Sequence, residues 1–66
     1  MRNNIINKFT GYVDKHNNKI YVDQIVLWCG NKQIVKYIND GFFIVDLIDK
    51  TIRPIDFWID ELEVIE

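Results

Sequence analysis

The chain has 66 residues, a formal net charge of −2 at pH 7 and a single cysteine. A chain of this length forms one domain and buries only about 60% of the surface that its unfolded form exposes, so its stability is marginal unless oligomerisation or another contribution adds to it. The negative charge disfavours non-specific attraction to nucleic-acid phosphates. The lone cysteine excludes an internal disulfide and suits a reducing cytoplasm. No apolar run approaches the length of a membrane span.

Residues 9–26 predict a β-hairpin around which the rest of the chain is organised. Two β-prone runs flank a polar centre, where the Asn17-Asn18 pair tolerates left-handed backbone at little steric cost. Gly11 interrupts the first run, and a glycine within a strand marks a bulge or a bend. Residues 1–8 hold three asparagines and only the Ile5-Ile6 pair as apolar anchors, so we expect a frayed start that becomes a strand near Ile6.

The next two runs predict further strands. Residues 25–29 form an unbroken apolar stretch, which favours a strand covered on both faces, with Cys29 as a small buried side chain at its end. A tight turn is predicted at residues 30–32, and residues 33–38 follow as a strand with alternating side chains.

A second hairpin is predicted at Asn39-Asp40-Gly41, because Asp-Gly supplies the positive φ that a tight hairpin turn needs. Its return strand covers residues 42–47. One face of this strand is entirely apolar, formed by Phe43, Val45 and Leu47. Phe42 and Ile44 partly cover the other face before Asp46 breaks it.

The C-terminal part predicts a short helix and a last strand. Residues 48–53 form a polar connection, and Pro54 has the fixed φ that suits the first position of a helix. Apolar side chains then recur at helical spacing and predict an inward stripe, formed by Ile55, Trp58, Ile59 and Leu62. At about 100° per residue, Phe57 lies about 200° from Ile55, on the outward side. Residues 61–66 alternate like a half-buried strand, which we expect to close a barrel against the first strand.

Together these elements predict an all-β fold: a small, partly open SH3-like barrel of about five strands, with one short helical turn before the last strand. The whole chain, residues 1–66, forms this single domain.

Residues 9–26 also resemble the YopX family of bacteriophage and prophage proteins, in which a Phe/Tyr-Thr-Gly run, an Asp-Lys-Asn-Gly-Lys turn and an Ile-Tyr-Glu-Gly-Asp-Ile-Val run follow one another. Residues 55–65 are similar to the closing segment of that family. The resemblance implies its C-terminal β-barrel part, a phage or prophage origin and a place in the cytoplasm of the bacterial host. Where the family favours Gly in the first turn this chain has Asn18, so we predict a positive φ there.

Candidate groups for catalysis or ligand binding are few. His16 falls in a predicted turn without a second His or Cys nearby, so we expect a solvated side chain rather than a zinc ligand. The glycines are isolated and form no phosphate loop. Five aspartates fall at turns or strand ends, where we expect them to bind backbone N–H groups, with a weak Ca²⁺ or Mg²⁺ site as the lesser alternative; they are Asp14, Asp23, Asp40, Asp46 and Asp49. We therefore predict no catalytic residue, no cofactor and no metal site, and an enzyme is the least favoured class.

The favoured function is a non-catalytic interaction module that binds a host or phage protein, with a second copy of the chain as a further partner. Residues 56–66 hold five acids and no base, and the outward Phe57 lies among them. We predict that Phe57 anchors a partner, with Asp56, Asp60 and Glu61 as a polar rim.

The alternative is a single-stranded nucleic-acid-binding barrel, in which basic and aromatic side chains share one face and stack on bases. The residues that this alternative would use are Lys19, Lys32, Lys36, Tyr21 and Tyr37. The net negative charge makes nucleic acid the less favoured partner.

Overall fold

The computed structural model describes residues 8–65, so the predicted frayed start at residues 1–7 lies outside the described part of the chain. The elements in chain order are β1 (Phe9–Val13), β2 (Lys19–Tyr21), β3 (Ile25–Trp28), β4 (Asn31–Ile38), β5 (Gly41–Asp46), β6 (Ile52–Pro54), α1 (Ile55–Trp58), the 3₁₀ helix η1 (Ile59–Glu61) and β7 (Glu63–Val64). No helix within residues 8–65 is long and apolar enough to cross a membrane.

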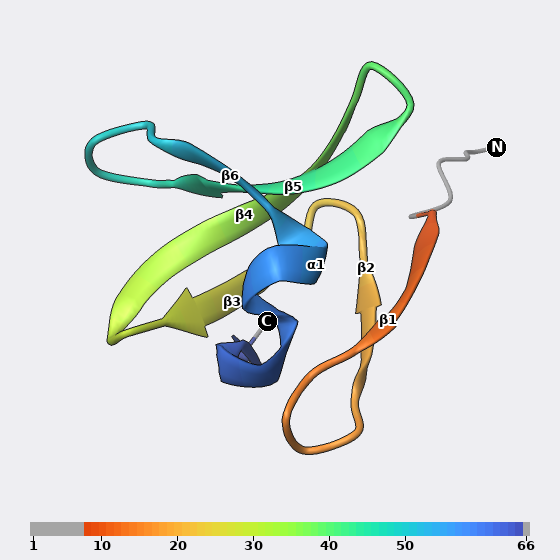
Figure 1. Cartoon of the computed structure of the whole chain (residues 1–66). Coiled ribbons are helices and arrows are strands. Elements are labelled where there is room, and N and C mark those ends of the chain that lie inside the picture. The colour runs from red at the N-terminus through yellow and green to blue at the C-terminus, as the bar shows by residue number, and fades with distance from the viewer. Residues whose placement is uncertain (1–7, 66) are drawn as a thin grey trace, which may run out of the picture.

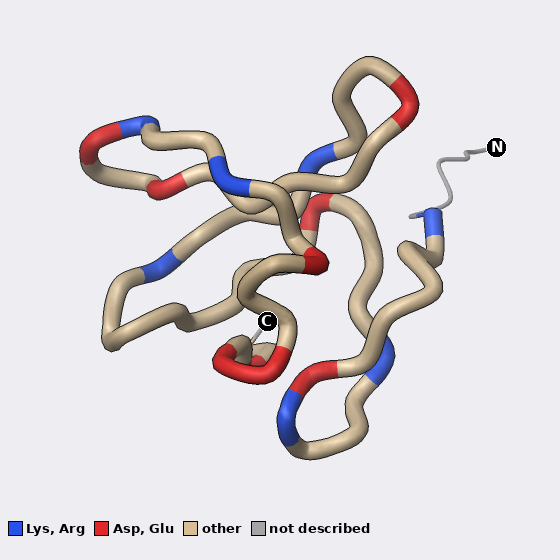
Figure 2. Tube along the Cα trace, viewed as in Figure 1, with Lys and Arg blue, Asp and Glu red and all other residues tan. Residues whose placement is uncertain are grey.

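The strands form two antiparallel sheets (Figure 1). β1 and β2 make a two-stranded hairpin, and the other five strands make one sheet in the order β6-β5-β4-β3-β7. The predicted mostly-β fold, with one short helical segment before the last strand, is therefore confirmed. Most charged residues lie in turns and at strand ends rather than within the sheet (Figure 2).

Both tight turns of the main sheet are two-residue turns with positive φ at both positions. Asn39 and Asp40 have φ of 48° and 67°, and Cys29 and Gly30 have φ of 52° and 79°. This geometry matches the right-handed twist of the flanking strands. The second predicted hairpin is confirmed, but the predicted turn at residues 30–32 begins one residue earlier. Cys29 therefore lies exposed at the tip of a turn, and its predicted burial is wrong.

The first hairpin turns at Asn17 rather than Asn18. The N–H of Asn17 donates to the carbonyl of Asp14 (2.9 Å), and Asn17 itself has φ of 70°. A turn followed by one left-handed residue is a common three-residue hairpin loop. The prediction of positive φ at Asn18 is wrong by one position. The predicted bulge is confirmed, because Gly11 has φ of 86° at a shift in the β1–β2 register.

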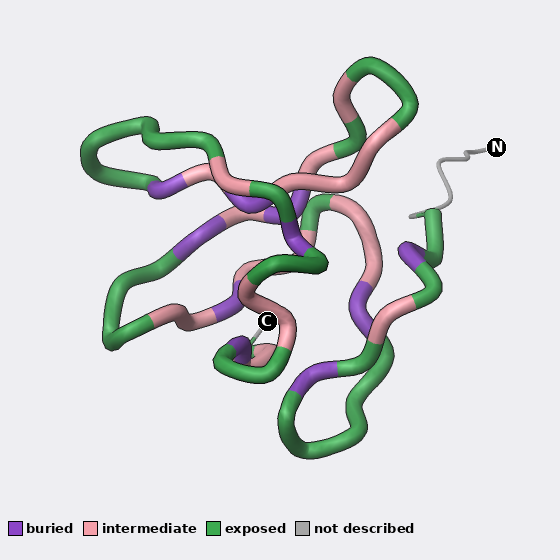
Figure 3. Tube along the Cα trace, viewed as in Figure 1, coloured by how far each residue is buried: buried purple, intermediate pink, exposed green. Residues whose placement is uncertain are grey.

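The core lies between the concave face of the main sheet, the hairpin and the helical segment (Figure 3). Its fully buried apolar side chains come from all three parts; they are Ile20, Val26, Val35, Ile44, Ile55 and Leu62. Within β3 only Val26 is fully buried, so that strand is not covered on both faces as predicted. The predicted helical stripe is confirmed at its two ends, where Ile55 and Leu62 are buried.

The inner face of β5 is the one that Asp46 breaks, and not the entirely apolar one. Ile44 lies opposite Val35 in the ladder and both are buried, so alternation turns Asp46 inward and Phe43 outward. Asp46 is tolerated there because Gln33, its partner in the ladder, donates its Nε2–H to the carboxylate at 2.9 Å.

Two further predictions about the C-terminal part need correction. The connection predicted at residues 48–53 contains the edge strand β6, which pairs with β5, and Pro54 ends this strand instead of starting the helix. The last strand pairs with β3, with Val64 opposite Val26, and not with the first strand. Both elements have only two or three residues, so the sequence pattern gives them little signal.

Candidate partner-binding surface

The helical segment presents Phe57 to solvent. Ile55 and Leu62 are fixed in the core, and a helical turn between them leaves Phe57 with 72% of its surface exposed. Its ring meets that of Trp58 edge to face at 4.8 Å, and Trp58 in turn packs on Trp28 at 4.9 Å. The predicted outward direction of Phe57 is confirmed.

The acids predicted to surround Phe57 are all exposed but do not form one group. Glu61 accepts a hydrogen bond from the indole N–H of Trp28 (3.1 Å), which ties it to β3. Asp60 lies in η1, and Asp56 lies at the start of α1. Of the three, Asp56 also borders a pocket that the sequence did not reveal.

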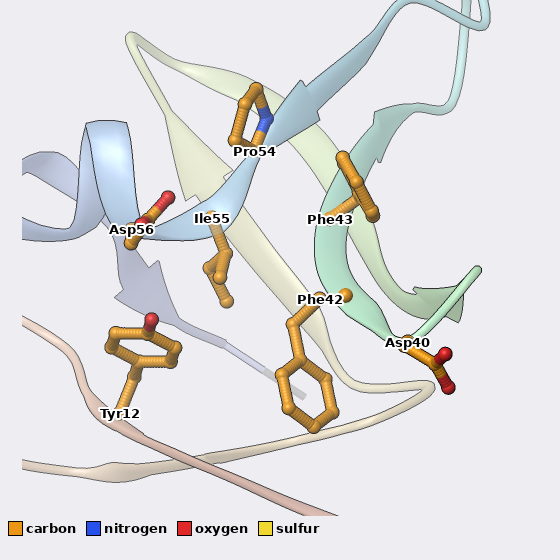
Figure 4. A pocket seen from close by; sticks show the side chains of 8 residues that line it. Tyr12, Asp40, Phe42, Phe43, Pro54, Ile55 and Asp56 are labelled. Atoms are coloured by element: carbon orange, nitrogen blue, oxygen red, sulfur yellow. The ribbon is translucent and has the colours of Figure 1, made fainter.

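This pocket has a volume of about 260 Å³. Tyr12 from β1 and Phe42 from β5 stand on either side of a hollow, with Ile55 between them (Figure 4). Asp40 and Asp56 lie at opposite ends of the group (Figure 4). The lining residues come from segments that are far apart in the sequence, so no local pattern points to the pocket.

Tyr12 is held beside α1 by Asp14, which joins the hairpin to the last strand. Oδ1 of Asp14 accepts the backbone N–H groups of His16 (2.9 Å) and Asn18 (2.7 Å), and Oδ2 accepts the N–H of Val64 (2.8 Å). Burial of this carboxyl acts to raise its pKa, but these hydrogen bonds, together with one from the Asn18 side chain, outweigh burial and hold the pKa below its ordinary value of 3.8. The position of one pocket wall thus depends on a buried carboxylate.

Asp46 has the same chemical role in the turn after β5. Hydrogen bonds from the Gln33 side chain and from the N–H groups of Ile48 and Asp49 lower its pKa. These contacts confirm the predicted turn chemistry for Asp14 and Asp46. Residues 8–65 contain no group of three or more His, Cys, Asp or Glu side chains placed to hold a metal ion.

The residues of the nucleic-acid alternative are not brought onto one face. Lys32 and Lys36 lie on one face of β4, and Tyr37 lies on the other. The Nζ of Lys36 also forms a salt bridge with Oδ1 of Asp23 (2.7 Å). Lys19 and Tyr21 lie on β2, in the other sheet. The described lysines and arginine are scattered over several turns and strands (Figure 2).

The outer face of the main sheet carries an unusual apolar row. Four side chains lie directly opposite one another across four strands; in order they are Ile25, Ile34, Val45 and Ile52. The last of them, on the edge strand β6, is 56% exposed. This row offers a second surface for association.

No family model, curated protein or solved structure matches the chain. The surface around Phe57 and the outer apolar row are therefore interpreted from the chemistry of their own side chains.

Proposed function

We propose that this chain is a non-catalytic interaction module of phage or prophage origin, related to the YopX family, which binds a host or phage protein in the bacterial cytoplasm. The observation that carries the proposal is Phe57, which is 72% exposed although Ile55 and Leu62 hold its helical segment in the core. An exposed aromatic side chain with a polar surround is the usual form of an interface anchor.

The proposal includes a partly open SH3-like barrel as the scaffold. β6 and β3 are separated by two strands in the sheet, yet the guanidinium of Arg53 lies 4.3 Å from the ring centre of Trp28. Such a contact needs a strongly curled sheet. The return of β7 to β3 after the helical turn supports the same scaffold.

The experiment compares three immobilised proteins as baits in a bacterial lysate. Phe57→Ser removes the anchor, and Ile48→Ser is the matched control, because Ile48 is 85% exposed in the turn after β5 and its loss lowers surface hydrophobicity in a similar way. We expect the wild type and Ile48→Ser to retain the same protein and Phe57→Ser to lose it. Equal retention by all three baits, or retention of nucleic acid instead of protein, contradicts the proposal.

A further inference from the structure

The pocket beside α1 is sized and shaped for a single side chain. Its volume of about 260 Å³ lies below the range of roughly 300–1,000 Å³ that is usual for pockets enclosing small-molecule ligands. The rings of Tyr12 and Phe42 and the side chain of Ile55 form the apolar part of its lining, and Asp40 and Asp56 belong to the polar part. The ring of Phe42 is supported from behind by Tyr37, with 5.0 Å between the ring centres. A flat or extended apolar stem fits between such walls.

The charges at the ends of the pocket are both negative. Asp40 and Asp56 are exposed, and among residues 8–65 neither forms an ion pair with a basic side chain. Asp40 accepts a hydrogen bond from the hydroxyl of Tyr37 (3.2 Å), which fixes the direction of its carboxylate. The two carboxylates stand at opposite ends of the lining group, so they do not converge on one metal ion (Figure 4). Both carboxylates add negative charge that complements a cationic group between the rings, and the Asp40 carboxylate acts from a longer distance because it is turned away from the rings (Figure 4).

We infer that this pocket binds an arginine side chain of the partner protein. A guanidinium stacks on aromatic faces and donates in two directions to carboxylates, whereas the compact ammonium of lysine is more strongly hydrated and makes neither arrangement as well. A polypeptide is the source because Phe57 follows Asp56 directly, so a segment seated in the pocket continues over the exposed anchor. The inference rests on the proposed function in that both place the partner against α1.

The test is an NMR titration of the ¹⁵N-labelled protein with a capped Gly-Gly-Arg-Gly-Gly peptide. The matched peptide carries citrulline, which has the shape of arginine without its charge, and a third peptide carries lysine. We expect the arginine peptide to cause saturable shifts at the amides of Tyr12, Gly41 and Asp56, with weaker binding of lysine and the weakest binding of citrulline. Equal binding of arginine and citrulline, shifts confined to other residues, or no shifts at millimolar peptide overturns the inference.

Variants of the pocket sharpen the result. Asp56→Asn and Asp40→Asn should each weaken the arginine peptide by about twofold to fivefold, the range for exposed ion pairs. Tyr12→Leu removes a stacking face and should weaken it by about twofold to thirtyfold. Tyr21→Leu is the control, since its ring packs on Phe9 (5.3 Å) outside the pocket. Undiminished binding by both Asn variants overturns the inference.

The peptide assay needs no natural partner, so its outcome is separate from that of the lysate experiment. Loss of capture in Phe57→Ser together with failure of the arginine peptide leaves the interaction module standing and removes only the pocket. Binding of the arginine peptide together with equal capture by the wild type and Phe57→Ser supports the pocket and removes Phe57 as the anchor.

Discussion

Replacing Asp14 by Asn tests how the hairpin is attached to the rest of the domain. The substitution keeps the shape of the side chain but removes its charge and turns one acceptor oxygen into a donor. Oδ1 and Oδ2 together accept three backbone N–H groups at 2.7–2.9 Å, from His16, Asn18 and Val64. In the variant at least one of these N–H groups faces an NH₂ group or loses its partner.

The size of the expected destabilisation follows from the number of hydrogen bonds that the Asp14 carboxylate accepts. A hydrogen bond to a charged group contributes about 1.5–3 kcal/mol and a neutral one about 0.5–1.5 kcal/mol, while a buried N–H left without a partner costs about 1–3 kcal/mol. Two weakened bonds and one lost bond give a destabilisation of about 3 kcal/mol for Asp14→Asn. Since a domain of this size has a total stability of roughly 3–10 kcal/mol, this loss lowers the melting temperature by about 12–24 °C.

The assay is urea unfolding followed by the fluorescence of Trp28 and Trp58, with Asp49→Asn as the matched control. Asp49 is an exposed turn aspartate whose carboxylate accepts one backbone N–H, from Thr51 (2.9 Å), so its loss should cost less than about 1 kcal/mol. Equal urea midpoints for the wild type and Asp14→Asn at pH 7 would refute the reasoning.

The same comparison depends on pH. The folded-state pKa of Asp14 lies below its unfolded value, so its contribution to stability is present above about pH 4 and is lost as the pH falls through the folded pKa. The advantage of the wild type over Asp14→Asn should therefore shrink below pH 4. The lowered pKa of Asp46 is common to both proteins and cancels. A difference that stays constant down to pH 2.5 would show that the carboxylate charge is not the cause.

Three further predictions follow from the placement of other side chains. Phe57→Ser should change the free energy of unfolding by less than about 1 kcal/mol and Trp58→Ser should lower it by about 2 kcal/mol or more, as measured in urea; the reverse order would show that the helical phase is wrong. Asn17→Gly should be neutral or mildly stabilising and Asn17→Val should cost about 1 kcal/mol or more, because a β-branched residue resists positive φ, and equal melting temperatures would contradict this. The chain should self-associate at high micromolar concentration through the outer apolar row, so Ile52→Lys should keep it monomeric and Ile48→Lys should not. Sedimentation of the wild type as a concentration-independent monomer would exclude this self-association.

Local patterns predicted the parts of the fold that depend on neighbouring residues. Positive-φ turns need Asn, Asp or Gly, so the hairpins were located to within one residue, and helical spacing correctly separated the buried Ile55 and Leu62 from the exposed Phe57. The exact turn residue was missed because Asp14 holds the loop by hydrogen bonds that place the left-handed position at Asn17.

Long-range contacts determined two features that local sequence patterns do not show, the buried face of β5 and the pocket. The entirely apolar face of β5 turns outward, and a cross-strand hydrogen bond from Gln33 satisfies Asp46, so the buried face can include a carboxylate. The pocket depends on long-range packing, since Tyr12 and Phe42 line it together only after the hairpin docks on the sheet. Of the four residues predicted for the partner-binding surface, Asp56 lines the pocket, and Phe57, Asp60 and Glu61 do not.

The hydrogen bond from Val64 to Asp14 spans 50 positions of the chain and has a consequence for synthesis on the ribosome. The main-chain N–H of Lys15 likewise donates to the carbonyl of Leu62 (3.1 Å). The hairpin at residues 9–21 is made early but has no docking site until residues 62–64 have left the exit tunnel. Because such distant contacts slow folding, the domain should fold in one late step once residues 62–64 have emerged, and a nascent chain halted before residue 62 should remain sensitive to protease.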